Sequence, residues 1–176
     1  MAKMSTDPKI SMKELTSYLH LIYHHNDEEL RKEFDRSLSF QDGFFDRWER
    51  ADRLGFGLGS SIYNSSLVYG EVSVAEETWI GPYTVLDGSG GHIKIGRNCS
   101  VSAGVHIYTH DTVMWALSGG KSQQKVGSVV VGDCTHIGSQ SILNLGATVG
   151  SHCVVAANSF LSGNFEDLSI IAGTPA

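Results

Sequence analysis

Apolar residues recur along this chain at two different spacings, and the change falls near residue 58. From residue 10 to about 54 they recur every three or four positions, which predicts amphipathic helices. Ser11 followed by Glu14 is a capping-box pattern that predicts the start of the first helix. A second helix is expected to be capped by Asn26 or Asp27. We therefore expect a helical cap over residues 1–58, whose apolar face is made of Met12, Leu15, Leu19, Ile22, Tyr23, Leu30, Phe34, Leu38, Phe44, Phe45 and Trp48.

From residue 59 an Ile, Leu or Val falls at every sixth position, with two interruptions. The fourteen positions are Ile62, Val68, Val74, Ile80, Leu86, Ile95, Val101, Ile107, Val131, Ile137, Leu143, Val149, Val155 and Leu161. A six-residue period fits neither an α-helix, with 3.6 residues per turn, nor a strand of constant direction. We interpret each unit as a short strand and a turn. Three units then make a triangular coil of ~18 residues that stacks on the next through parallel ladders.

This pattern predicts a mainly β fold, a parallel β-helix of about five triangular coils over residues 59–167, followed by a tail over 168–176. The aliphatic side chains are expected to fill the interior. Four residues after most of them stands a small side chain, which fits the tight space near a corner. Cys99 and Cys153 occupy such positions and are expected to be buried fillers. The interruptions are "LDGSGG" and a longer excursion loop over about 112–128, which includes the apolar run Val113–Leu117.

Composition narrows the possible functions. The net charge of −6 comes without a basic run, which argues against a nucleic-acid partner. No apolar stretch reaches the ~20 residues of a membrane span, and the first ten residues lack the apolar core of a signal peptide. Three cysteines at spacings unlike a zinc site predict a reduced, cytoplasmic protein without a metal.

The repeats resemble a known family. IGPYTV (80–85), IGRNCS (95–100), IGSQSI (137–142) and VGSHCV (149–154) match the hexapeptide pattern of left-handed parallel β-helix acyltransferases, and the ending "SIIAGTPA" is similar too. Within that family the chain most resembles sugar O-acetyltransferases of the maltose, galactoside and nodulation-factor type and their relatives in polysaccharide clusters. The resemblance implies left-handed coils, a homotrimer with active sites between subunits, acetyl-CoA as donor, and one histidine near an excursion loop as general base.

The pattern of this sequence places that histidine at His110, three residues after Ile107 and at the edge of the excursion loop. An imidazole, with an ordinary pKa of about 6.5, suits removal of a proton from a hydroxyl at neutral pH. Asp111 follows directly and is expected either to orient the imidazole or to contact the acceptor. Asp87 lies one coil earlier on the same face and is expected near His110, as an acceptor-binding or orienting carboxylate.

The resemblance also implies a donor side. The residues expected to line the acetyl-CoA site are His136, Gly138, Ser139, Ala156, Ala157, Thr174 and Trp115. Gly138 and Ser139 match the place where a backbone N–H faces the thioester carbonyl, and His136 stands where relatives often have tryptophan. Trp115 belongs to the apolar part of the excursion loop, which is expected to cover the cofactor or a neighbouring subunit.

The sequence therefore predicts an acetyl-CoA-dependent O-acetyltransferase that acts on a sugar-type hydroxyl by direct transfer. Two alternatives remain. One is an N-acetyltransferase for a nucleotide-linked amino sugar, although the N-terminal residues lack a βαβ nucleotide-binding pattern. The other is a γ-type carbonic anhydrase, which needs a lone histidine followed much later by two. Here His106 and His110 come first and His136 later, which is the reverse order.

Overall fold

The structure, a computed structural model, describes residues 10–176 in two units, one ending at Asp46 and the other running from Arg47 to Ala176. Residues 1–9, on which the expectation about a signal peptide rests, lie outside the described residues. Within residues 10–176 no helix has the length and apolar character needed to cross a membrane.

The first unit contains helix α1 (Met12–Phe34) and the short helix α2 (Phe40–Phe44). The predicted capping box at Ser11 and Glu14 is present, with both reciprocal hydrogen bonds. The expected second helix start at Asn26 or Asp27 is wrong, because α1 continues through both. Their polar groups have other partners: the Asn26 amide donates to the Gly43 carbonyl, and the Asp27 carboxylate accepts from Arg31 and Ser37.

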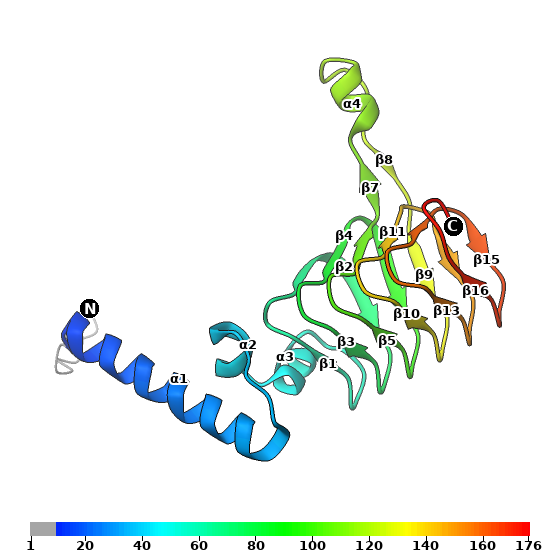
Figure 1. Ribbon diagram of the computed structural model, residues 1–176. Coiled ribbons are helices and arrows are strands. Elements are labelled where there is room, and N and C mark those ends of the chain that lie inside the picture. Colours follow the sequence, from blue (N-terminus) through cyan, green and yellow to red (C-terminus); the bar gives the residue numbers. More distant parts are fainter. Residues whose placement is uncertain (1–9) are drawn as a thin grey trace, which may run out of the picture. The chain divides into compact units, whose positions relative to one another are not determined.

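The second unit begins with helix α3 (Arg47–Arg53) and continues as a parallel β-helix with three faces (Figure 1). The first face stacks β1 (Ser61–Ile62), β3 (Trp79–Ile80), β5 (Ser100–Val101), β10 (His136–Ile137), β13 (Val154–Val155) and β16 (Ile170–Ile171). The other two faces form one folded sheet of β2 (Leu67–Val74), β4 (Val85–Ile95), β6 (His106–Tyr108), β9 (Val129–Val131), β11 (Ile142–Leu143), β12 (Thr148–Val149), β14 (Phe160–Leu161) and β15 (Asn164–Phe165). The predicted fold class is confirmed, with six rungs where about five were expected, because β16 lies in the residues expected as a tail.

The predicted interior is confirmed position by position. Each face contributes one column of stacked side chains, such as Leu86, Ile107 and Leu143 on the second face. Thirteen of the fourteen predicted aliphatic residues are at most 5% exposed, and Val68 is partly buried against them. Full burial of one such side chain is worth about 1.5–3 kcal/mol, so these columns are the main source of stability in the coil.

The small corner residues do more than fill space. The hydroxyl of Thr135 donates to the Gly150 carbonyl and accepts from the Cys153 amide, so it joins two consecutive rungs. Thr78, Ser66 and Ser141 make the same pair of bonds one rung onward. The two predicted filler cysteines are buried, and burial raises the pKa of the Cys99 thiol. Because unpaired backbone groups inside a coil are costly, these four hydroxyls stabilise the corners at which they stand.

Both interruptions of the repeat fall at the corner between the second and third faces. At the first one, β4 continues around the corner as an eleven-residue strand, pairs with β6 through Val85–Asp87 and pairs with β9 through Ile93–Ile95. At the second, the chain leaves the coil as an antiparallel arm of β7 (His110–Asp111) and β8 (Lys125–Val126), tipped by helix α4 (Val113–Leu117). Figure 1 shows this arm projecting from the stacked rungs.

Candidate active site

His110 stands where the chain leaves the coil. Strand β6 ends at Tyr108, Thr109 is fully buried, and His110 is the first residue of the arm. The side chain of His110 is 25% exposed, and its Nδ1 lies 3.9 Å from Oδ2 of Asp87. Nδ1 is itself buried and has no hydrogen-bond partner, so Asp87 is the carboxylate that this nitrogen faces. The other ring nitrogen, Nε2, lies on the opposite side of the imidazole ring.

Asp87 occupies the position in β4 that pairs with Tyr108 of β6. Its side chain is 15% exposed. One carboxylate oxygen, Oδ1, accepts a hydrogen bond of 3.1 Å from the Ser89 amide, which leaves Oδ2 toward His110. The structure thus brings Asp87 and His110 together from neighbouring rungs, as their places in the repeat predict.

Asp111 has a different setting. Its Oδ1 accepts a hydrogen bond from the Val113 amide and so caps the first turn of α4. In the arm it pairs with Lys125, while His110 pairs with Val126. Neighbouring residues in an extended segment point to opposite sides. The contacts of Asp111 therefore explain the shape of the arm, and Asp87 is the better-placed partner for the imidazole.

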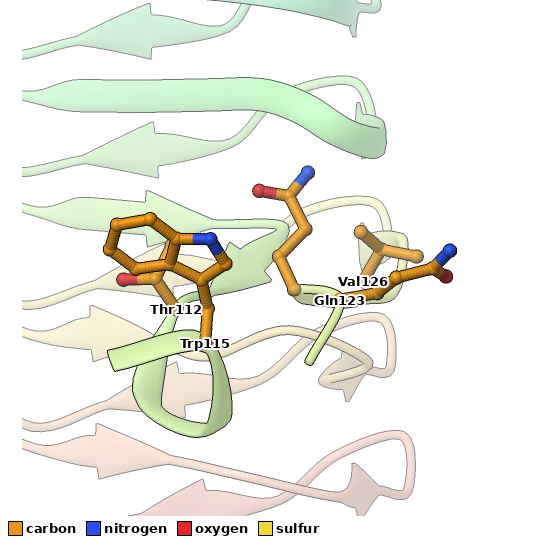
Figure 2. A pocket seen from close by; sticks show the side chains of 5 residues that line it. Thr112, Trp115, Gln123 and Val126 are labelled. Carbon is orange, nitrogen blue, oxygen red and sulfur yellow. The ribbon is translucent and has the colours of Figure 1, made fainter. Parts of the chain in front are cut away.

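The arm carries an open hollow of about 630 Å³ lined by Thr112, Trp115, Gln123, Gln124 and Val126 (Figure 2). The Trp115 indole lies on one side, and Gln123 and Val126 on the other. None of these side chains carries a charge. Val126 is the cross-strand partner of His110, so the hollow begins beside the candidate base. Around it, Val113, Met114 and Leu117 are 56–78% exposed, which is unusual for a surface segment in water.

The expected donor-side residues lie at a different corner, between the first and second faces. Gly138 and Ser139 form the turn after β10, and Ala156 and Ala157 form the same turn one rung later. Hydrogen bonds connect the rungs there: the Asn158 amide donates to the Ser139 carbonyl, and the Thr174 hydroxyl donates to the Asn158 carbonyl. Ala157 and Ser139 are exposed, and His136 is exposed on the adjoining first face.

The two groups of residues lie at opposite edges of the second face. His110 follows the end of β6, whereas Gly138 and Ser139 precede the start of β11, which is the parallel neighbour of β6. About five residues of extended chain separate the two edges, or roughly 16 Å at 3.3 Å per residue. A single copy of the chain therefore does not bring His110 and the donor-side turn to one reacting bond.

Sequence reasoning missed two residues at the His110 corner, Thr109 and Gly90. A β-carbon on Gly90 would lie 2.6 Å from the β-carbon of His110 and 2.7 Å from the Thr109 carbonyl oxygen. Only glycine allows this close approach. The "SGG" insertion contained the signal, but its meaning depends on which strand lies next to it.

Two other histidines have local partners: His106 Nδ1 lies 3.1 Å from the Tyr108 hydroxyl, and His92 Nε2 lies 2.8 Å from the Ser73 hydroxyl. Among residues 10–176, no three His, Cys, Asp or Glu side chains are grouped as metal ligands would be.

Comparisons with known proteins support the sequence-based resemblance. The family model "Hexapeptide repeat of succinyl-transferase" matches residues 89–109 and 128–162. The carnitine operon protein CaiE of Proteus sp. (strain LE138) is 28% identical over 120 residues, which cover 65% of this chain and 61% of that protein. The bifunctional protein GlmU of Trichodesmium erythraeum (strain IMS101) is 29% identical over 133 residues, 62% of this chain and 28% of that protein. The chain thus spans less than two thirds of these curated relatives.

Solved structures share the fold. The hexapeptide-repeat-containing acetyltransferase VCA0836 of Vibrio cholerae O1 biovar eltor, complexed with acetyl coenzyme A, has a TM-score of 0.64 at 20% identity and covers 94% of this chain and 86% of its own. A mutant of AntD, an N-acyltransferase from Bacillus cereus in complex with dTDP and coenzyme A, has a TM-score of 0.58 at 25% identity and covers 68% of each chain. The predicted resemblance to hexapeptide-repeat acyltransferases is confirmed.

Proposed function

We propose that this hexapeptide-repeat chain is an acetyl-CoA-dependent O-acetyltransferase that transfers an acetyl group to a hydroxyl of a sugar-type acceptor, with His110 as the general base. The observation that carries this proposal is the geometry at the arm exit. His110 directs Nδ1 toward Asp87 at 3.9 Å and keeps about a quarter of its side chain exposed. A base needs a partner that can orient one ring nitrogen, and the Asp87 carboxylate is the group that Nδ1 faces.

The proposed step is a direct transfer. His110 Nε2 takes the proton from the acceptor hydroxyl as its oxygen attacks the thioester carbonyl carbon. The new C–O bond forms, the C–S bond breaks, and the proton passes from the imidazolium to the leaving thiolate. During this step the Asp87 carboxylate holds the Nδ1–H and stabilises the positive charge on the ring.

The carbonyl oxygen becomes negatively charged during the attack and needs a hydrogen-bond donor. Of the two predicted residues, the Gly138 amide already donates to the Val155 carbonyl within the ladder. We therefore assign the donor to the Ser139 amide, which lies in the exposed turn. The small exposed surface of Ala157, on the next rung, leaves room for the pantetheine chain beside it.

Because His110 and Ser139 lie at opposite edges of one face, we propose that each active site forms between two copies of the chain. One copy contributes His110, Asp87 and the arm, and its neighbour contributes the donor-side corner. A homotrimer with three such sites satisfies this arrangement through closed head-to-tail contacts. The exposed apolar side chains of α4 would then lie against the neighbouring copy or its bound acetyl-CoA.

Trp115 belongs to the cofactor side of this arrangement. The hollow that it lines is uncharged and offers the amides of Gln123 and Gln124. The pantetheine chain of acetyl-CoA is also uncharged and carries two amides, which pair well with such side chains. Use of acetyl-CoA and three free cysteines agree with the cytoplasmic location expected from the sequence.

The test is an acceptor screen with acetyl-CoA, in which release of free thiol is measured against free sugars, amino sugars and nucleotide sugars. With a working acceptor, His110→Ala is expected to lower kcat by roughly 10²–10⁴. His25→Ala is the matched control, because His25 is exposed on α1 of the other unit. A wild-type rate in His110→Ala, with normal folding, would refute the assignment.

A second candidate function is N-acyl transfer to a nucleotide-linked amino sugar. It is supported by the fold shared with AntD, an N-acyltransferase solved with dTDP and coenzyme A. Mild alkaline treatment of the screen's acetylated products separates the two, because an amide product resists hydrolysis whereas an ester does not. Stoichiometric zinc in the purified protein would instead favour the carbonic anhydrase alternative.

A further inference from the structure

Thr109 is the buried hydroxyl residue that stands directly before the candidate base. It is fully buried at the corner between the second and third faces, directly before His110. The equivalent corner positions in three other rungs are Gly70, Gly88 and Gly163, two residues after Val68, Leu86 and Leu161. A hydroxyl side chain thus replaces glycine in the rung from which the arm departs.

The hydroxyl of Thr109 connects the corner to the rung that carries Asp87. Its Oγ1 donates to the Asp87 carbonyl at 2.7 Å and accepts from the Gly90 amide at 3.0 Å. The Thr109 amide donates to the same Asp87 carbonyl at 3.1 Å. Both ends of the Asp87–Gly90 turn are therefore fixed to the residue that precedes the candidate base.

The backbone of Thr109 also fixes the arm. Its carbonyl accepts a 2.8 Å hydrogen bond from the Gly127 amide, where the returning strand re-enters the coil. On one side of Thr109 lies the turn that presents Asp87, and on the other lies the arm that begins with His110. The separation of the Asp87 carboxylate and the His110 imidazole is thus set across this one buried residue.

We propose that Thr109 is a positioning residue for the Asp87–His110 pair, and that its hydroxyl keeps the Asp87 carboxylate facing Nδ1 of His110. This inference rests on the proposed function, in which that pair is the base. Without the hydroxyl, the Gly90 amide loses its partner, and the Thr109 amide provides the only remaining hydrogen bond from Thr109 to the turn. A displacement of about 1 Å at a catalytic pair is enough to lower a rate by about a hundredfold.

The test compares Thr109→Val, which removes the hydroxyl at nearly constant volume, with Thr109→Ser, which keeps it. We expect Thr109→Val to lower kcat by roughly 10–100-fold and Thr109→Ser to stay within about threefold of wild type. The KM for acetyl-CoA should hardly change, because Thr109 is buried and lines neither the donor-side corner nor the hollow at Trp115.

The matched control is Thr135→Val. Thr135 is equally buried, and its hydroxyl also donates to a carbonyl and accepts from an amide, but at the corner between the third and first faces. Both valine variants should show a similar loss of thermal stability, and only Thr109→Val should lose kcat. Equal kcat values in the two variants would overturn the proposal. If Thr109→Val does not fold, Thr109→Ala is compared with Thr135→Ala in the same way.

A double-mutant cycle tests whether Thr109 acts through Asp87. In an Asp87→Asn background, Thr109→Val should cost less than about threefold in kcat, because the carboxylate it positions is already gone. A full additional loss in that background would contradict the proposal. A wild-type rate in His110→Ala would contradict the proposed function instead, so the two failures are distinguishable.

Discussion

Complementation between two inactive variants is the sharpest test of an active site shared between copies. His110→Ala removes the base from one edge of the second face. Ala157→Trp places an indole on the exposed donor-side corner and should block the pantetheine path without disturbing the buried interior. Each variant alone is expected to be inactive. A mixed oligomer, however, contains interfaces where the His110 of one copy meets the intact donor side of the other.

The activity that mixed oligomers recover is set by the fraction of their interfaces that hold an intact site. An intact site needs a copy with His110 on one side and a copy with Ala157 on the other, so its probability is the product of the two fractions. In randomly assembled oligomers at a 1:1 ratio, about 25% of the sites are intact, and the recovered activity peaks at that ratio. This value holds for any closed ring with one such site per interface, and therefore does not depend on the ring being a trimer.

The assay measures free-thiol release from acetyl-CoA with the acceptor identified in the screen. The variants are co-expressed with two different affinity tags. The whole mixture is assayed for the expected recovery of about 25%, and oligomers that carry both tags are then isolated, in which about one site in three is intact if the ring is a trimer. Parent homo-oligomers mixed without subunit exchange serve as the control. If the doubly tagged oligomers are no more active than the two parents at every ratio, the base and the donor side act within one chain, and the reasoning from opposite edges is refuted.

Three further predictions concern the cofactor hollow, the core and the thiols. Trp115→Ala should raise the KM for acetyl-CoA more than the KM for the acceptor, and the opposite change would place the hollow on the acceptor side. Leu143→Ala, at a fully buried position in the second-face column, should lower the free energy of unfolding by about 2–5 kcal/mol, measured by denaturant titration; a loss below 1 kcal/mol would contradict the packed column. Burial raises the pKa of Cys99, so less of this thiol is ionised at a given pH. A thiol reagent at pH 8 should therefore label the exposed Cys134 first, which mass spectrometry of the labelled peptides measures. Fast labelling of Cys99 in the folded protein would contradict its burial.

The interior of the coil could be predicted because its rule is local. One aliphatic residue per strand, at a fixed spacing, is enough to define which side chains face inward. The corner hydroxyls escaped this reasoning: Thr135 satisfies the rule as a small filler, but its partners, the Gly150 carbonyl and the Cys153 amide, belong to the next rung. The predicted cap at Asn26 failed for a similar reason, since its amide bonds to Gly43, seventeen residues away.

The fixed spacing of the repeat also predicted part of the candidate site. Asp87 could be placed near His110 because the repeat puts them one rung apart on one face, and their separation of 3.9 Å follows from that register. The resemblance implies active sites between subunits, but it does not say that His110 and Ser139 lie at opposite edges of one face. Their separation depends on which corner each turn occupies, and that is visible only once the strands are assigned to faces.

The two interruptions of the repeat contact each other and form one structural unit. The "SGG" insertion in β4 and the arm leave the regular coil at the same corner on neighbouring rungs. Gly90 lies against the outgoing chain, where a β-carbon would lie 2.6 Å from His110, and Gly91 lies against the returning chain, where a β-carbon would lie 3.0 Å from the Ser128 amide. The His92 amide adds a hydrogen bond to the Ser128 hydroxyl. The extra residues of β4 thus contact both ends of the arm, the outgoing strand at His110 and the returning strand at Ser128. Glycine is needed at position 90, because only glycine allows that close contact, and the contact fixes the direction in which His110 leaves the coil. Under the proposed function, the insertion thus positions the base, and the exposed apolar residues of the arm are the surface that the second copy covers.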